Sequence, residues 1–237
     1  MICSNIEYGV YIDSREKDND RQFIEVLFEE FHQEGFMIQD IIVNKDALVD
    51  SVKVDEYVVR PKLKNKKNNE VIVVLSDCIV YQIGSKIENG KLREVNNDTE
   101  RSKNIIHRII NKLDNKVTKV SFTSESFVEN KFLIDPKGCN SFLSGLASLK
   151  RENKVQFNEQ MGDDIINICH NSFMYDKIMK FYSKMNSQIF EFKGTRINND
   201  FNIEILNDEN YYEEEINSYF DKFIELNNKI NKEIRYE

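Results

Sequence analysis

The sequence is poor in the residues that form tight, phosphate-binding loops. Only eight of its 237 residues are glycine and two are proline. Neither G-x-x-x-x-G-K-[ST] nor G-x-G-x-x-G occurs, and these are the patterns whose backbone amides cradle nucleotide phosphates. We therefore expect few rigid turns and no nucleotide cofactor.

Cysteine and histidine are also scarce, and no spacing brings them together. The cysteines form no C-x-x-C pair: Cys3, Cys78, Cys139 and Cys169. The histidines form no H-E-x-x-H motif: His32, His107 and His170. A zinc site needs clustered ligands, so we expect reduced thiols, no metal, no cofactor and no catalytic constellation.

Long hydrophobic runs are absent as well. The longest are short, such as "VIVVL" at residues 71–75, whereas a transmembrane helix needs roughly 20 apolar residues. The opening "MICSNIEYGV" lacks the basic start and apolar stretch of a signal peptide. We expect a cytoplasmic protein that does not contact a membrane.

What is present is an alternation of strand-like and helix-like segments in the first half. β-branched and aromatic residues favour strands, and apolar residues at helical spacing favour helices. The predicted order is a strand at 6–12, a helix at 20–35, strands at 36–43, 54–63, 70–75 and 78–83, a helix at 98–115 and a strand at 116–122.

The second half predicts the order βαββα. The segments are a strand at 154–160, a long helix at 163–185, strands at 189–194 and 201–206, and a final long helix at 208–234. The whole pattern predicts an α+β fold of two ferredoxin-like lobes, with helices packed on one face of antiparallel sheets. We place the lobes at residues 1–137 and 154–237, joined by a connecting segment at 138–153.

The charge is concentrated in one acidic segment. The formal net charge is −8, and residues 197–221 hold eight acidic residues and no lysine or arginine. One interpretation is structural, because carboxylates at a helix start interact favourably with the helix dipole. The other is a patch that binds a protein with a basic surface; its residues would be Asp208, Glu209, Tyr211, Tyr212, Glu213, Glu214 and Glu215.

A basic stretch, "RPKLKNKKNNE" at residues 60–70, stands out against this acidic background. Its cations are Arg60, Lys62, Lys64, Lys66 and Lys67. The first three alternate along a predicted strand and therefore share one face. They are interpreted as charges that protect an edge strand from aggregation, as a nucleic-acid contact through phosphates, or as a contact with another protein.

The stretch "VYIDSREKD" offers a further reading of the N-terminal region. A strand that leads into Asp13 and Glu16 resembles the opening of the structure-specific endonucleases related to XPF. That resemblance implies acidic residues that hold Mg²⁺. The chain departs from the family's pattern, because it has no Glu-Arg-Lys strand downstream.

Together these observations favour a non-enzymatic protein-interaction protein with an acidic partner-binding patch. Asparagine, lysine and isoleucine are abundant, which suggests an AT-rich genome. We therefore add the hypothesis of an inhibitor of, or adaptor to, a nucleic-acid-processing machine in phage–bacterium conflict. The alternative is an RNA- or DNA-binding protein or metal-dependent nuclease, which would use the basic hairpin with Asp13 and Glu16. The oligomeric state is left open.

Overall fold

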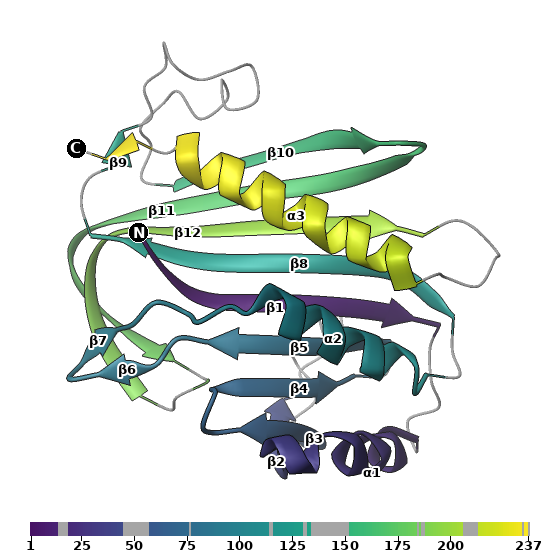
Figure 1. Cartoon of the computed structure of the whole chain (residues 1–237). Helices are drawn as coiled ribbons and strands as arrows, with labels where there is room; N and C mark the ends of the chain where they lie inside the picture. The colour runs from purple at the N-terminus through teal and green to yellow at the C-terminus, as the bar shows by residue number, and fades with distance from the viewer. Residues whose placement is uncertain are drawn as a thin grey trace.

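Nine antiparallel strands form one sheet that runs through both halves of the chain (Figure 1). A computed structural model describes residues 1–13, 19–44, 57–75, 77–113, 116–129, 132–133, 152–183, 185, 188–205, 213–233 and 235–236. The strand order is β10-β11-β12-β8-β1-β5-β4-β3-β2. The strands are β1 (Ile2–Ile12), β2 (Met37–Asn44), β3 (Tyr57–Asn65), β4 (Glu70–Val74), β5 (Cys78–Gly84), β8 (Val117–Val128), β10 (Glu152–Met161), β11 (Asp164–Ser183) and β12 (Gln188–Glu204).

Three helices cover one face of this sheet, and the other face is left without helices in the described part of the chain (Figure 1). They are α1 (Asn19–Phe31), which continues into a short 3-10 turn at His32–Glu34, α2 (Thr99–Ile110) and α3 (Glu213–Glu233). The described residues also form two small ribbons, β6 (Ile87–Glu88) with β7 (Lys91–Leu92) and β9 (Phe132–Leu133) with β13 (Arg235–Tyr236). None of the described helices is long and apolar enough to cross a membrane.

The main core lies between the helices and the sheet. Aromatic rings from β1, β8, β12 and α3 meet there; Tyr8 lies edge-on to Phe122 and Phe220, with ring centroids 5.3 and 5.2 Å apart. Phe201 and Phe223 stack at 6.0 Å. Edge-to-face and offset contacts of this kind stabilise a core beyond the burial of area alone.

The helices follow the signals that the sequence contains. In α1 the fully buried residues Ile24, Leu27 and Phe31 recur at helical spacing. Gly35 then has a φ of 93°, the left-handed conformation that ends a helix at low cost. Asp98 caps α2, since its side chain accepts a hydrogen bond from the Arg101 backbone nitrogen at 3.1 Å.

The α+β class, the antiparallel sheet and the long C-terminal helix are confirmed. The two ferredoxin-like lobes are not confirmed, because β12 of the second half pairs with β8 of the first, with Phe201 opposite Phe122. The predicted connecting segment at 138–153 lies outside the described residues except for the backbone of residues 152–153, so the lobe boundary remains a prediction.

The long helix predicted at residues 163–185 is wrong. That segment forms β11, a strand of 20 residues. Its buried side chains alternate, as expected of a strand, but two of them are polar: Ile166, Ile168, His170 and Ser172. Polar residues on the buried face conceal the period of two that would identify a strand. The two strands predicted at 189–194 and 201–206 are likewise parts of one strand, β12.

The C-terminal end of β11 and the N-terminal end of β12, which pair with each other, bend away from the sheet (Figure 1). The pairing shifts between Tyr175 and Met179, which places extra residues on β11 at that point. Beyond the bend, the arm, defined as residues 176–183 with 188–193, carries its own hydrophobic cluster. Phe181, Phe190 and Phe192 of the arm pack on Phe127 of β8, with centroid distances of 5.4, 5.4 and 4.8 Å.

Candidate binding groove

The face of the sheet opposite the helices, called here the open face, is covered with polar side chains in cross-strand rows. One row runs Gln82, Glu7, Thr123 and Asp200 across β5, β1, β8 and β12. The next row runs Asn5, Glu125 and Asn198 across β1, β8 and β12. Because alternate side chains of a strand point to opposite faces, the same strands bury Ile6, Tyr8 and Phe122 on the helix side.

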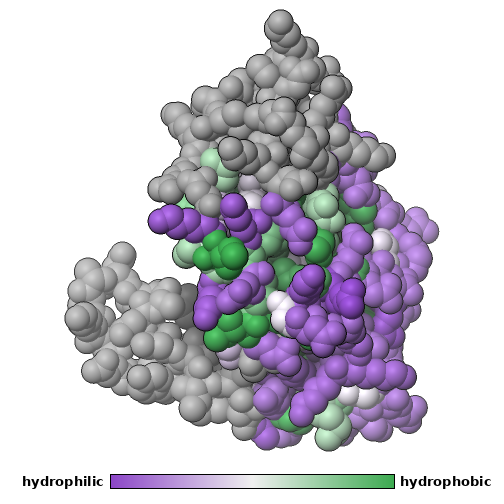
Figure 2. All heavy atoms as spheres, turned by 90° about the vertical axis from the view of Figure 1, so that its left-hand side faces the viewer, coloured by the Kyte–Doolittle hydropathy of each residue, from purple (hydrophilic) through white to green (hydrophobic). Residues whose placement is uncertain are grey.

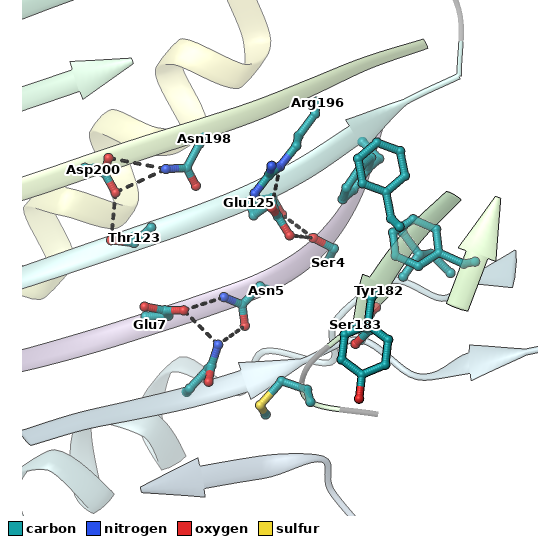
Figure 3. Close-up of a pocket in the computed structure, with 17 residues that line it drawn as sticks. Ser4, Asn5, Glu7, Thr123, Glu125, Tyr182, Ser183, Arg196, Asn198 and Asp200 are labelled. Atoms are coloured by element: carbon teal, nitrogen blue, oxygen red, sulfur yellow. Dashed lines mark hydrogen bonds and ion pairs between the residues drawn. The ribbon is translucent and has the colours of Figure 1, made fainter. Parts of the chain in front are cut away.

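The arm turns this open face into a groove. A cavity of about 480 Å³ lies between the polar rows and the arm. Figure 3 shows the polar residues on β12, β8 and β1, with Tyr182 and Ser183 of the arm beside them. A volume of this size falls within the range of ligand pockets, roughly 300–1,000 Å³.

Each of the three carboxylates in the groove is held in place by neighbours. Glu7 Oε1 accepts hydrogen bonds from Asn5 Nδ2 and Gln82 Nε2, both at 2.7 Å. Asp200 Oδ1 accepts from Thr123 Oγ1 at 2.9 Å and from Asn198 Nδ2 at 3.4 Å.

The third carboxylate, Glu125, already has a cationic partner. Its Oε2 accepts from Ser4 Oγ at 2.8 Å, and its Oε1 accepts from Arg196 Nε at 2.6 Å. The residues that line the groove thus include three carboxylates and one guanidinium. This excess of negative charge favours a positively charged ligand.

The surroundings of Glu7 in the groove shift the pKa of its carboxyl. Burial raises the pKa of its carboxyl above the ordinary value of 4.5, and the negative charges of Glu125 and Asp200 raise it further. The hydrogen bond from Asn5 acts in the opposite direction. A cation bound beside Glu7 would relieve this penalty, because an opposite charge favours the ionised form.

Aromatic rings of the arm form the apolar wall of the groove. Phe181, Tyr182 and Phe190 line it together with Phe127 of β8. Phe181 and Phe190 stack with ring centroids 5.5 Å apart. Carboxylates together with aromatic faces are the two surfaces that bind an arginine or lysine side chain most favourably.

The acidic patch predicted near the start of α3 lies partly outside the described residues. Asp208, Glu209, Tyr211 and Tyr212 are not described, and only the backbone of Glu213 is. Glu214 is exposed. Glu215 accepts a hydrogen bond from the Tyr219 hydroxyl at 3.0 Å, within a group that also includes Asp164. The patch therefore remains a prediction.

The predicted basic hairpin is present as β3, its turn and β4. The interpretation of its cations as protection of an edge strand is wrong, because β3 also pairs with β2 on its other side, with Pro61 opposite Asp40. Lys62 and Lys64 lie on the open face, and Lys66 and Lys67 are exposed in the turn. Lys64 Nζ donates to the backbone oxygen of Met185, next to the arm, at 2.7 Å. Burial lowers the pKa of Lys62, and the charge of Lys64 lowers it further.

Of the three other predicted site residues, Arg60, Asp13 and Glu16, the structure describes only the side chain of Asp13. Arg60 lies in β3, but its side chain is outside the described residues, as is all of Glu16. Asp13 is exposed just after β1. Within the described part of the chain, no group of three or more histidine, cysteine, aspartate or glutamate side chains could hold a metal ion.

None of the described cysteines or histidines is among the residues that line the groove. Cys3, Cys78 and Cys169 are free thiols, and Cys139 lies outside the described residues. Burial raises the pKa of Cys3 to about 11 and that of Cys78 to about 12, so neither is a thiolate at neutral pH. His170 is fully buried under α3, and burial lowers its pKa; its Nδ1 contacts Asn199 Oδ1 at 2.6 Å.

Sequence reasoning missed the groove. Asp200 belongs to the predicted acidic segment, but Glu7, Glu125 and Arg196 are not among the predicted site residues. A signal was present: polar residues recur at every second position in Asn5 and Glu7, and in Arg196, Asn198 and Asp200.

Comparisons of the sequence with known protein families and curated proteins give no match: no family model matches the chain, and no curated protein gives a significant sequence match. The groove itself is therefore the basis for assigning a function.

Proposed function

We propose that the protein binds a positively charged segment of another protein in the groove of its open face. The observation that carries the proposal is the lining of the groove, in which three carboxylates outnumber one guanidinium beside an aromatic wall. The partner is thus a protein with a basic surface, the class of partner that the acidic segment at residues 197–221 suggested. The surface differs from the one at the start of α3.

Three features support a protein segment as the ligand. The hydrogen-bonding groups of the floor come from side-chain amides as well as carboxylates, including Asn5, Gln82 and Asn198, and these can contact a peptide backbone. The volume of about 480 Å³ is enough for one or two side chains. The tyrosine at the rim, Tyr182, is of the residue type enriched at interface hot spots.

Nucleic-acid binding through the basic hairpin remains the alternative. Lys62 and Lys64 share the open face with the groove, but Lys64 already donates to Met185. Because the groove beside them carries net negative charge, it would repel phosphates rather than extend a basic surface. The role as an inhibitor or adaptor in phage–bacterium conflict remains a hypothesis about the process.

The proposal is tested by fluorescence anisotropy with a labelled peptide rich in arginine and lysine, and an acidic peptide of equal length as control. The wild type should bind the basic peptide only, with an affinity that falls as salt rises. Combined Glu7→Gln and Asp200→Asn substitutions should weaken binding by about tenfold or more, because hydrogen bonds to charged groups contribute roughly 1.5–3 kcal/mol each.

Two matched variants decide where the peptide binds. Glu204→Gln removes a carboxylate from an exposed position of β12 and should change the affinity little. Combined Glu214→Gln and Glu215→Gln test the patch predicted at α3; a loss there, with no loss in the groove variant, would assign binding to α3. Absence of basic-peptide binding, or binding of single-stranded nucleic acid that requires Lys62 and Lys66, would contradict the proposal.

A further inference from the structure

The outer side of the arm presents an exposed apolar surface next to the groove. Its large side chains are Ile178, Tyr182 and Ile189, which are 65%, 61% and 59% exposed. Figure 2 views the molecule from the side where β11 and β12 bend and shows hydrophobic side chains at the surface among hydrophilic ones. Exposed apolar residues that gather in one place mark interaction surfaces more often than isolated ones do.

The pairing of the arm explains why these side chains lie together. Tyr182 is opposite Ile189, and Phe181 is opposite Phe190. Since neighbouring residues of a strand point to opposite sides, Phe181 and Phe190 pack inward while Tyr182 and Ile189 project outward. Ile178 precedes them in the chain, is 65% exposed and lies within the shift of pairing between Tyr175 and Met179. The described core therefore does not cover these residues.

The charged pair on the same side is weak. Lys180 Nζ and Glu191 Oε1 are 3.8 Å apart, and both side chains are largely exposed. A solvent-exposed pair at this distance contributes little to stability. The pair lies between the apolar residues without covering them. Protein interfaces commonly combine apolar side chains with polar ones that remain accessible to solvent.

Tyr182 connects this surface to the groove. It lines the cavity, together with Glu7, Glu125 and Asp200, and it also pairs with Ile189 on the outside of the arm. A chain lying in the groove and passing over Tyr182 would therefore reach Ile189 within a few residues. Acidic groups and an apolar surface thus follow one another along a single path.

We propose that the partner segment is amphipathic, with a basic stretch in the groove directly followed or preceded by apolar residues that pack on Ile178, Tyr182 and Ile189. This inference rests on the proposed function and specifies its partner. The charge of the groove selects the basic part, and the apolar surface of the arm supplies a second, salt-independent contact.

Three labelled peptides of equal length test the inference. The first combines a basic stretch with a leucine-rich end, the second replaces the leucines by serine, and the third replaces the basic residues by glutamine. The first should bind the wild type at least about tenfold more tightly than the second, because burial of one or two aliphatic side chains is enough for that factor. The difference should persist at high salt.

Substitutions in the arm provide the second half of the test. Combined Ile178→Ser and Ile189→Ser should make the first peptide bind only as tightly as the second. Ile165→Ser changes a residue of β11 that is 50% exposed and lies outside the arm, and should preserve the difference. Circular dichroism and the urea midpoint check that all variants fold, as expected for exposed positions.

The outcomes separate the two proposals. If the second peptide binds and requires Glu7 and Asp200, but the first binds no better, the proposed function stands and the amphipathic partner is wrong. If neither basic peptide binds, both are wrong. If the wild type forms dimers by sedimentation and the Ile178→Ser, Ile189→Ser variant does not, the arm is a surface for a second copy of the chain, and the inference is overturned.

Discussion

Gly194 lies against Val128 so closely that a β-carbon on it would be 2.0 Å from the Val128 backbone oxygen. Gly194 has a φ of 138°, a conformation that other residues rarely adopt. It pairs with Tyr175 at the point where the pairing of β11 and β12 shifts. The bend that forms the wall of the groove therefore depends on a residue without a side chain.

Gly194→Ala should destabilise the protein by more than about 2 kcal/mol. Both the clash with Val128 and the strained backbone contribute to this cost, which for the backbone alone is about 1–3 kcal/mol. The measurement is equilibrium unfolding in urea. Gly90→Ala is the control, because Gly90 also has a positive φ, 74°, but a β-carbon on it would have no atom within 4 Å; it should cost only about 1 kcal/mol. Equal losses in the two variants would contradict the close approach.

The sequence was sufficient to predict helices α1 and α2. In α1, apolar spacing agrees with a helix-ending glycine, and in α2 it agrees with an N-terminal cap, so each helix has a single interpretation. It was insufficient for β11, because His170 and Ser172 occupy buried positions where apolar residues would identify a strand. His170 belongs to a polar group that forms only when α3 packs on the sheet, because its partner Asn199 donates to Asn227 of α3.

The groove could not be predicted because it depends on which strands are neighbours. The polar residues Asn5 and Glu7 indicate one solvent-facing side of β1, but nothing in them shows that β12 lies two strands away. Asp200 and Glu7 are 193 positions apart in the chain and are brought together through Thr123 of β8. Long-range pairing of this kind is determined by packing across the whole sheet.

An ion-pair network around the buried carboxylate of Glu70 joins α2 to the sheet, and we expect its loss to destabilise the protein. Glu70 is buried; Arg101 Nε lies 3.1 Å from Glu70 Oε1, and Arg101 Nη1 donates to Glu34 Oε2 at 2.8 Å. Arg101→Met would leave the carboxylate of Glu70 buried without its cation. We expect a loss of about 3 kcal/mol in the free energy of unfolding, as measured in urea.

The matched variant for this network is Arg93→Met. Arg93 pairs with Glu88 at 2.9 Å, but both side chains are more than half exposed. Its loss should cost less than about 1 kcal/mol. A similar cost for Arg93 and Arg101 would show that burial of Glu70 adds nothing to the strength of its pair.

Lys64 should fasten the tip of the arm to the sheet. Its Nζ donates to the Met185 backbone oxygen at 2.7 Å, and Lys64→Met keeps most of the aliphatic stem while it removes the donor. We expect faster hydrogen exchange of the arm amides and a loss of about 1 kcal/mol in stability. Lys62→Met, on the same face of β3, is the control and should leave the exchange of the arm unchanged. Exchange that is the same in all three proteins would show that aromatic packing on Phe127 alone holds the arm.

Glu7 should make stability and binding depend on pH in opposite directions. Its pKa is raised in the folded state by burial, and then by Glu125 and Asp200. Between the ordinary value of 4.5 and the raised value, the folded protein therefore holds a proton that the unfolded chain has released. The free energy of unfolding should fall as pH rises through this window. A bound cation lowers the pKa of Glu7, so affinity for the basic peptide should rise over the same window.

Glu7→Gln should reduce both effects. Glutamine retains an oxygen that can accept from Asn5 and Gln82, so the hydrogen bonds at 2.7 Å need not be lost. The variant should be at least as stable as the wild type at neutral pH, with a flatter decline of stability and a smaller rise of affinity with pH. Urea unfolding and peptide anisotropy measured across the same pH series check the two slopes, with Glu204→Gln as the control for loss of one exposed charge. A variant that is less stable at neutral pH, while its affinity still rises as in the wild type, would show that Glu7 supports the sheet and takes no part in recognising the cation.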